Sequence, residues 1–182
     1  MAEFRIETDR LALRSWRAAD VDPFYAMGRD PRVMEFLGPL MDRVDVAAAQ
    51  ARQSDFQHRY GHCFWALERL SDGAFLGFCG LKPGPAETPL EGLIEIGWRL
   101  AHHAWGHGYA REAAAASLDW GFANLPAPAI WAVTVPGNIR SWGLMQRLGM
   151  VRHSQLDFAH PALASDDPLR PHIVYAMPRP TT

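Results

Sequence analysis

The hydrophobic pattern changes its period several times along this chain of 182 residues. Arg10 to Trp16 alternates apolar and polar positions as a strand does. A short helix is expected from Asp30 to Gly38, because an aspartate cap is followed directly by proline at the first helical position. Val44 to Arg59 is a longer alanine-containing segment, which predicts a helix that ends at Gly61.

In the middle of the chain the hydrophobic pattern repeats every two residues, as in a strand. Phe64 to Arg69 and Ala74 to Leu81 are short aromatic and aliphatic segments, and the Asp-Gly pair between them predicts a hairpin turn. Leu93 to Leu100 is the next predicted strand. Its alternation places an apolar row on one face and Glu95 on the other, so an acidic side chain is expected in mid-strand.

Beyond residue 100 the predicted strands and helices alternate. In chain order they are a helix, a strand, a helix and two strands: Ala110 to Phe122, Ile130 to Val135, Asn138 to Leu148, His153 to Phe158 and His172 to Met177. A strand, helix, strand, helix order implies a right-handed crossover and at least one parallel pair. The sequence therefore predicts one domain over residues 1–182. Its fold class is mixed α/β, with a mostly antiparallel central sheet and flanking helices.

Composition excludes several classes of protein. Hydrophobic residues make up 48% of the chain and the formal net charge is −2, which is ordinary for a globular domain. Lys and Arg are scattered, so neither a nucleic-acid nor a membrane surface is expected. The absence of a secretion signal and of an apolar run of about 18 residues predicts a cytoplasmic protein. Cys63 and Cys79 have apolar neighbours and no paired spacing, so we expect core residues rather than a disulfide.

Candidate chemistry begins at the stretch WGHGYAREAAAASLDW, where Gly106 and Gly108 precede an alanine-rich helix. The first N–H groups of a helix are unpaired and carry partial positive charge, so a phosphate can bind there, with Arg111 adding charge. A flexible connection between strand and helix explains the same glycines equally well. A dinucleotide fingerprint would need a third glycine in place of Arg111, and no Gly-Lys-Ser/Thr of a P-loop is present.

A second candidate pair is Asn138 and Ser141, three residues apart at the start of the predicted helix. Asn138 is typical of a helix cap and Ser141 of a first-turn residue. Polar side chains at the carboxyl end of a strand also lie where ligands bind in α/β sheets. His103 and His107 lie in a loop and lack the glutamate of a zinc helix, so no metal site is expected.

Taken in order, the motifs EIGWRL, WGHGYAREA and NIRSWGLMQRLGM, with TDRLALR at the start and HIVYAM at the end, resemble the GNAT superfamily of acetyl-CoA-dependent N-acetyltransferases. Within it, the chain is similar to the branch of the ribosomal-protein N-terminal acetyltransferases RimJ and RimL. The resemblance covers nearly the whole chain. It implies the GNAT fold, with the parallel strand pair at the cofactor cleft, and acetyl-CoA as the cofactor.

The family's pyrophosphate loop, Arg/Gln-x-x-Gly-x-Gly/Ala, is matched by Gly108 and Ala110, with Trp105 in the Arg/Gln position. By resemblance, the strand from Trp98 to Leu100 hydrogen-bonds the pantetheine arm, and the amide near Trp98 is the usual oxyanion donor. The full set of implied cofactor contacts is Trp98, Arg99, Leu100, Trp105, Gly106, His107, Gly108, Tyr109, Ala110, Arg111, Asn138 and Ser141.

The implied reaction is direct transfer of an acetyl group to a primary amine in a ternary complex. It needs a neutral amine, a stabilised oxyanion and a proton for the leaving thiolate. Glu95 is the candidate base, acting through water, although a salt-bridged strand residue is the alternative. Many relatives place a tyrosine acid seven residues after the asparagine, but Met145 stands there, which makes Ser141 the candidate acid.

The missing tyrosine also favours a second hypothesis, a non-catalytic acyl-CoA-binding or regulatory module. The acceptor amine is either a protein N-terminus or a small amine or amino acid, and the loops that would choose between them carry no readable code. A homodimer is plausible by resemblance.

Overall fold

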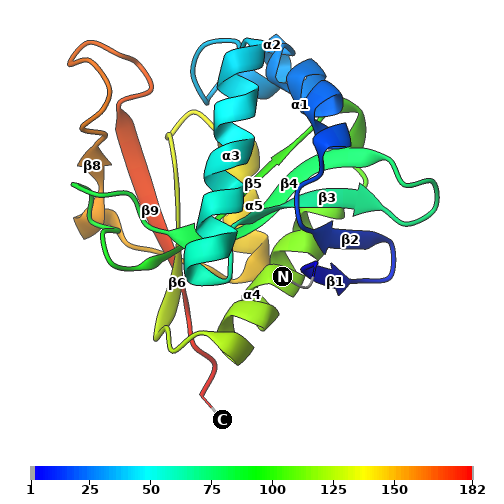
Figure 1. The fold of residues 1–182 in the computed structure, drawn as a ribbon. Helices are drawn as coiled ribbons and strands as arrows, with labels where there is room; N and C mark the ends of the chain where they lie inside the picture. The colour runs from blue at the N-terminus through cyan, green and yellow to red at the C-terminus, as the bar shows by residue number, and fades with distance from the viewer. Residues whose placement is uncertain (1–2, 182) are drawn as a thin grey trace.

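The structure, a computed structural model, describes residues 3–181 and is built on a nine-stranded sheet (Figure 1). The strands are β1 (Arg5–Glu7), β2 (Leu11–Arg14), β3 (Phe64–Arg69), β4 (Phe75–Pro83), β5 (Ile94–Leu100), β6 (Ala129–Thr134), β7 (Val151–Arg152), β8 (Phe158–Ala159) and β9 (Pro171–Pro178). The α-helices are α1 (Val21–Gly28), α2 (Pro31–Met34), α3 (Arg43–Tyr60), α4 (Tyr109–Asn124) and α5 (Ile139–Leu148). Three 3₁₀ turns are η1 (Ala18–Asp20), η2 (His102–Ala104) and η3 (Ser154–Leu156).

The strands follow the order β1-β2-β3-β4-β5-β6-β9-β7 across the sheet, and β8 pairs with β9. The paired strands are antiparallel except β5 and β6, which are parallel because the chain crosses over through α4 between them. This confirms the predicted architecture of a mostly antiparallel sheet with flanking helices and one parallel pair.

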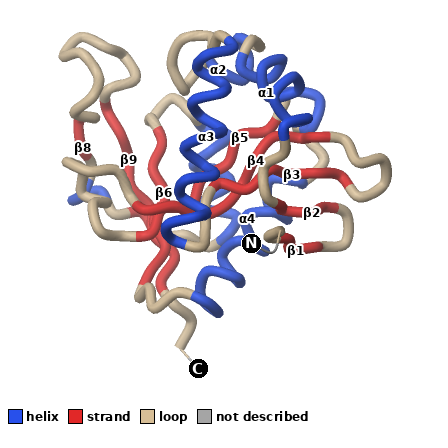
Figure 2. The backbone as a smooth tube through the Cα atoms, viewed as in Figure 1, coloured by secondary structure: helices blue, strands red, loops and turns tan. Residues whose placement is uncertain are grey.

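Apolar side chains pack against both faces of the sheet. One cluster joins alternate residues of the central strands to α4 and α5, with Trp65, Leu81 and Ile130 fully buried at its centre. The second cluster joins the opposite face, through Phe75 and Phe78, to α1, α2 and α3. In Figure 2, α1 and α2 lie above the strands and α4 lies below them. The sheet is thus the middle layer of three, and a ligand must enter at an edge or a gap between strands.

The predicted helix boundaries are explained by their caps. The Asp30 carboxylate accepts a hydrogen bond from the Arg32 amide at 3.0 Å and starts α2. Gly61, at φ 77°, ends α3, and Gly149, at φ 89°, ends α5. Gly73, at φ 71°, supplies the left-handed residue of the β3–β4 hairpin. Each of these signals lies within a few residues of its element, which is why the sequence predicts it.

Two sequence predictions need correction. The strand expected over His153 to Phe158 is wrong, because this segment forms the 3₁₀ turn η3 between the two-residue strands β7 and β8. An ion pair between Arg152 and Asp157 closes that turn, and the Val174 amide donates to Asp157 rather than to a continuous neighbouring strand. The helix expected from Asp30 to Gly38 is a single turn, Pro31–Met34.

Cys63 and Cys79 are buried and free, as the sequence predicts for core residues. Burial raises the pKa of the Cys79 thiol to about 12, so this thiol stays protonated and unreactive at neutral pH. Over residues 3–181, no helix has both the length and the apolar character needed to cross a bilayer. The same residues contain no cluster of three or more His, Cys, Asp or Glu side chains able to hold a metal ion.

Candidate active site

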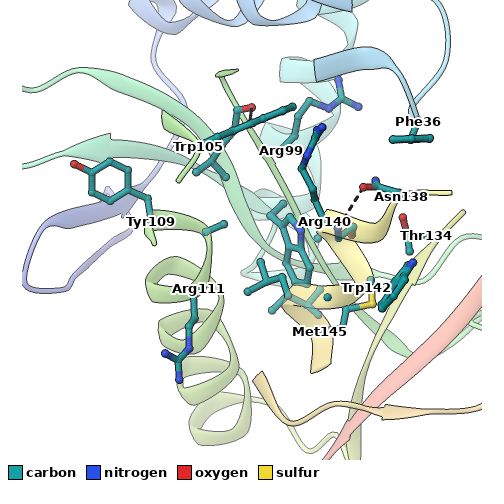
Figure 3. Close-up of a pocket in the computed structure, with 18 of the residues that line it drawn as sticks. Phe36, Arg99, Trp105, Tyr109, Arg111, Thr134, Asn138, Arg140, Trp142 and Met145 are labelled. Carbon is teal, nitrogen blue, oxygen red and sulfur yellow. Dashed lines mark hydrogen bonds between the residues drawn. The ribbon is translucent and has the colours of Figure 1, made fainter. Parts of the chain in front are cut away.

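A cleft opens where the parallel strands separate. β5 and β6 pair only at Ile94 with Ile130 and at Glu95 with Trp131, while β5 continues to Leu100. The gap beyond these pairs is the entrance to a cleft of about 1070 Å³. Its walls come from β5, the end of β6, the starts of α4 and α5, and the segment around α2 (Figure 3). The volume is at the upper end of small-molecule sites, so an extended ligand can enter.

Most of the predicted cofactor contacts line this cleft. The cleft-lining ones are Trp98, Arg99, Leu100, Trp105, Gly106, Gly108, Tyr109, Ala110, Arg111, Asn138 and Ser141. His107 is the exception: it lies outside the cleft wall, and its ring stacks on Tyr109 with the centroids 5.5 Å apart. The fold thus brings together three sequence segments that are separated by up to about forty residues.

One end of the cleft is made of backbone. Gly106 and Gly108 both have φ 80°, and Gly108 directly precedes α4. The first backbone bond of the helix runs from the Glu112 amide to the Gly108 carbonyl at 3.1 Å. The amides of Tyr109, Ala110 and Arg111 precede that bond and have no intrahelical acceptor. These donors and the positive end of the helix dipole suit an anion such as a pyrophosphate.

Arg10, in the turn between β1 and β2, holds this helix start in place. Its guanidinium pairs with Glu112 at 2.6 Å, donates to the His107 carbonyl at 3.0 Å and lies 4.7 Å from the Tyr109 ring centroid. Burial alone would raise the pKa of Glu112, but hydrogen bonds from Thr8 and Arg10 outweigh it and lower the pKa. Arg10 therefore neutralises a carboxylate that would otherwise repel a phosphate in the first turn.

The start of α5 forms the facing wall. Asn138 is the N-cap of α5, because its Oδ1 accepts a hydrogen bond from the Ser141 amide at 3.2 Å (Figure 3, dashed line). Its structural role is therefore the predicted one. Among the described residues, the Ser141 hydroxyl has no hydrogen-bond partner, and it faces the cleft. The hydroxyl is consequently available to a ligand.

Glu95 lies in the cleft wall but is not a free carboxylate. It is 9% exposed, and Lys82 on the neighbouring strand β4 forms an ion pair with its Oε2. The Lys82 ammonium also lies 5.3 Å from the centroid of the Phe64 ring. The salt-bridged alternative is thus present in the structure, and Oε1 remains as the acceptor for a proton or a water molecule. The two interpretations of Glu95 do not exclude each other.

Met145 occupies the position at which many relatives carry a tyrosine. Its side chain is 1% exposed and lines the cleft, so it presents a thioether where a hydroxyl would otherwise be. The cleft lining also includes the hydroxyls of Ser141 and of Thr134, the last residue of β6. Thr134 was not singled out by the sequence, although its place at the carboxyl end of a strand is a signal that could have found it.

The opposite end of the cleft is made of side chains. Val33, Phe36 and Leu37 from the α2 segment face Phe64 and Phe78 from β3 and β4. The Arg99 guanidinium lies among them, 3.4 Å from the Met41 sulfur and 5.3 Å from the centroid of the Phe78 ring. Sequence reasoning placed Arg99 in the site through its backbone and missed its side chain. No local pattern reveals that α2 folds over this face.

The family assignment rests on comparison with known proteins. The model of the acetyltransferase (GNAT) domain matches residues 10–151. The chain belongs to the GNAT acetyltransferase family. It is similar to the uncharacterized protein YkkB of Bacillus subtilis, with 33% identity over 150 residues that cover 82% of this chain and 86% of YkkB. Acetyl-CoA is the acyl donor that this family generally uses.

Solved structures share the fold. An acetyltransferase from Agrobacterium tumefaciens superposes with a TM-score of 0.78 and 26% identity over 97% of this chain and 95% of its own. A ribosomal-protein-S5-alanine acetyltransferase from Vibrio fischeri gives a TM-score of 0.73 and 16% identity, with 97% of both chains covered. At that identity the second likeness shows the fold alone. The superfamily is therefore shown, and the narrower RimJ/RimL branch is not.

Proposed function

We propose that this protein is an acetyl-CoA-dependent N-acetyltransferase that transfers an acetyl group directly to a primary amine in a ternary complex. The observation that carries the proposal is the continuous cleft between β5 and β6, with backbone donors at one end and a carboxylate in its wall. A ligand extended along that cleft reaches from the start of α4 to Glu95.

The residues present fit the cofactor. At Gly106 an added Cβ would meet no atom within 4 Å, and at Gly108 only Arg10 Nη2 at 3.5 Å, so the space beside these two glycine Cα atoms is open. Gly106 to Arg111 would hold the pyrophosphate, the edge of β5 from Trp98 to Leu100 would hold the pantetheine arm, and Asn138 and Ser141 would lie near the thioester. When bound, acetyl-CoA supplies the activated acyl group and the thiolate leaving group.

Protein groups would carry out the proton transfers and stabilise the developing negative charge. Glu95 would accept the proton of the incoming ammonium, directly or through a water molecule, because one of its oxygens is free of Lys82. The main-chain N–H near Trp98 would face the negative charge that develops on the acyl oxygen. Ser141 would donate a hydrogen bond to the departing sulfur. A homodimer and a cytoplasmic location remain predictions from the sequence alone.

A second candidate function is a non-catalytic acyl-CoA-binding module. Two observations favour it: Met145 is buried where an acid would stand, and Glu95 is paired with Lys82. Release of free CoA from acetyl-CoA, measured with a panel of peptides, amino acids and polyamines, separates the two functions. Calorimetric binding of acetyl-CoA combined with no amine-stimulated CoA release would reject the enzyme and retain the module.

A further inference from the structure

The cleft contains one arginine that is partly buried and that the fold leaves without a counter-ion. Five arginines line it: Arg32, Arg99, Arg111, Arg140 and Arg147. Arg32 is paired with Asp30 at 2.7 Å, and the last three lie on α4 and α5 at the cofactor end. Those three arginines also form no salt bridge within residues 3–181, but they are exposed to solvent. Arg99 lies at the far end, where the α2 segment covers β5, and of the five it alone is partly buried.

Partial burial makes the lack of a partner for Arg99 unfavourable in free energy. The Nε atom of Arg99 is enclosed and has no hydrogen-bond partner among the described residues. The Nη1 atom reaches only thioether sulfurs, at 3.7 Å from Met34 and 3.4 Å from Met41, which are weak acceptors. Removal from water lowers the pKa of Arg99 to about 10, so the guanidinium is still charged at neutral pH. A partly buried cation whose enclosed N–H has no acceptor, in a cleft that can hold a ligand, would be stabilised by an anion.

The position of Arg99 associates that anion with the acceptor rather than with the cofactor. Arg99 and Glu95 are four residues apart on one face of β5, so their Cα atoms are about 13 Å apart. Between them the Phe64 ring covers Gly97, where an added Cβ would come within 2.5 Å of the Phe64 Cζ atom. Figure 3 shows the Arg99 side chain extending toward the side of the cleft where Phe36 lies, away from Arg111 and the start of α4.

We propose that Arg99 binds the carboxylate of the acceptor, and that the acceptor is a small amine that carries a carboxylate, of the amino-acid type. The inference rests on the proposed acetyltransferase function and names its substrate class. One planar guanidinium matches one carboxylate in charge and in shape. A phosphate would bring nearly two charges against the one arginine of the cleft that is partly buried. The aromatic and aliphatic neighbours Val33, Phe36, Leu37 and Phe78 would surround the apolar part of such an amine.

Matched pairs of acceptors test the proposal directly. Apolar L-amino acids and ω-amino acids of increasing length are each compared with their own carboxamide, which keeps the amine and removes the negative charge. The wild-type kcat/KM for CoA release is expected to be at least about tenfold higher for the acid, the size of one charge-assisted hydrogen bond. Arg99→Met should bring that ratio to about one, because the acid and its carboxamide then differ in no contact with the guanidinium.

Control variants separate this contact from general damage. Arg43→Met removes a nearby arginine that lies outside the cleft and pairs with Asp22, and the acid-to-amide ratio should stay at the wild-type value. Arg99→Lys keeps the charge without the planar fork, so part of the ratio should remain. If Arg99→Met does not fold, the wild-type ratio and Arg99→Lys still decide the question.

The outcomes distinguish this inference from the proposed function. A wild-type ratio of one or below, or an unchanged ratio in Arg99→Met, overturns the carboxylate contact even if amines are acetylated. If no acceptor stimulates CoA release, the proposed function fails, and calorimetry of the same acids with the CoA-loaded protein decides instead. Heat of binding with wild type that is lost in Arg99→Met supports the contact, and no heat with wild type overturns it.

Discussion

The two ends of the cleft are built on different principles. The end that we propose binds the cofactor, the cofactor end, consists of main-chain amides at the start of α4, and its geometry follows from Gly106 and Gly108 in one short segment. The end that we propose binds the acceptor, the acceptor end, consists of side chains from α2, β3, β4 and β5, which meet only when the chain folds. Main-chain amides bind an anionic group whatever side chains surround them. A pocket made of side chains changes its ligand preference when one of those residues is substituted. This difference explains how one fold can keep its cofactor and vary its acceptor.

The two ends also differ in charge. At the start of α4, Arg10 already neutralises Glu112, so the amides themselves are left to bind the anion. At the acceptor end, Arg99 has no such partner. The carboxylate at the cofactor end is paired before any ligand binds, whereas the Arg99 guanidinium at the acceptor end has no anionic partner. Ligand binding should therefore change the stability of the acceptor end more than that of the cofactor end.

The largest expected effect on turnover is that of substituting Glu95, which lies between the two ends of the cleft. Glu95→Gln should lower kcat by about 10²-fold or more, because a general base is lost, with little change in acetyl-CoA affinity. The pH profile of kcat/KM provides the stronger measurement. If wild type and Glu95→Gln share the same acidic limb, Glu95 serves only as the partner of Lys82. Glu91→Gln, in the exposed loop before β5, is the matched control and should leave both quantities unchanged.

A change at the cofactor end should weaken binding rather than turnover. Gly108→Val should reduce acetyl-CoA affinity about tenfold or more in calorimetry, because a β-branched residue at φ 80° strains the loop by about 1–2 kcal/mol or moves its amides. Gly92→Val is a close control, since Gly92 has φ 77° and open space around it but lies outside the cleft. It should lose stability and keep affinity. Equal affinities in the two variants would remove the start of α4 from the site.

Ser141→Ala tests the facing helix. Loss of a hydrogen bond to the leaving sulfur should lower kcat about tenfold, or about 1.4 kcal/mol, while Tm hardly moves because Asn138 remains the cap. Asp42→Ala removes the cap of α3, whose side chain lies outside the cleft lining, and should show the reverse: a lower Tm with kcat per folded molecule retained. Stability lost and activity kept in Ser141→Ala would contradict its assignment as the acid.

The smallest expected effect is on the pH dependence of stability, through the ion pair between Arg10 and Glu112. The pKa of Glu112 is lowered in the folded state, so its contribution to stability is present above the unfolded pKa and is lost as the pH falls through the folded one. Wild type should therefore lose up to about 1 kcal/mol more stability than Glu112→Gln on acidification below about pH 4.5, because the pair is partly exposed. Parallel urea titrations at pH 7 and in the acid range measure this difference. Identical losses of unfolding free energy in the two proteins would show that the Arg10–Glu112 ion pair adds no stability.

The sequence by itself determined most of the elements and the glycine-led start of α4, where we propose that the cofactor binds. Caps, left-handed glycines and the switch from period two to a helical period act within a few residues, so Asp30, Gly61, Gly73 and Asn138 could be read directly. The helix start at Gly108 is equally local. The strand expected after His153 failed because a contact between Arg152 and Asp157 decided that turn.

Only the tertiary structure decided the environment of Arg99 and Glu95 and thus the proposed acceptor end. Arg99 meets Met34 and Met41, which are 65 and 58 residues away along the chain, because α2 folds over the face of the sheet that carries Phe78. The pairing of Glu95 with Lys82 likewise depends on the register between β4 and β5, in which the two residues lie directly opposite. Local preferences set backbone conformation, whereas the environment of a charged side chain depends on distant residues that no sequence period links to it.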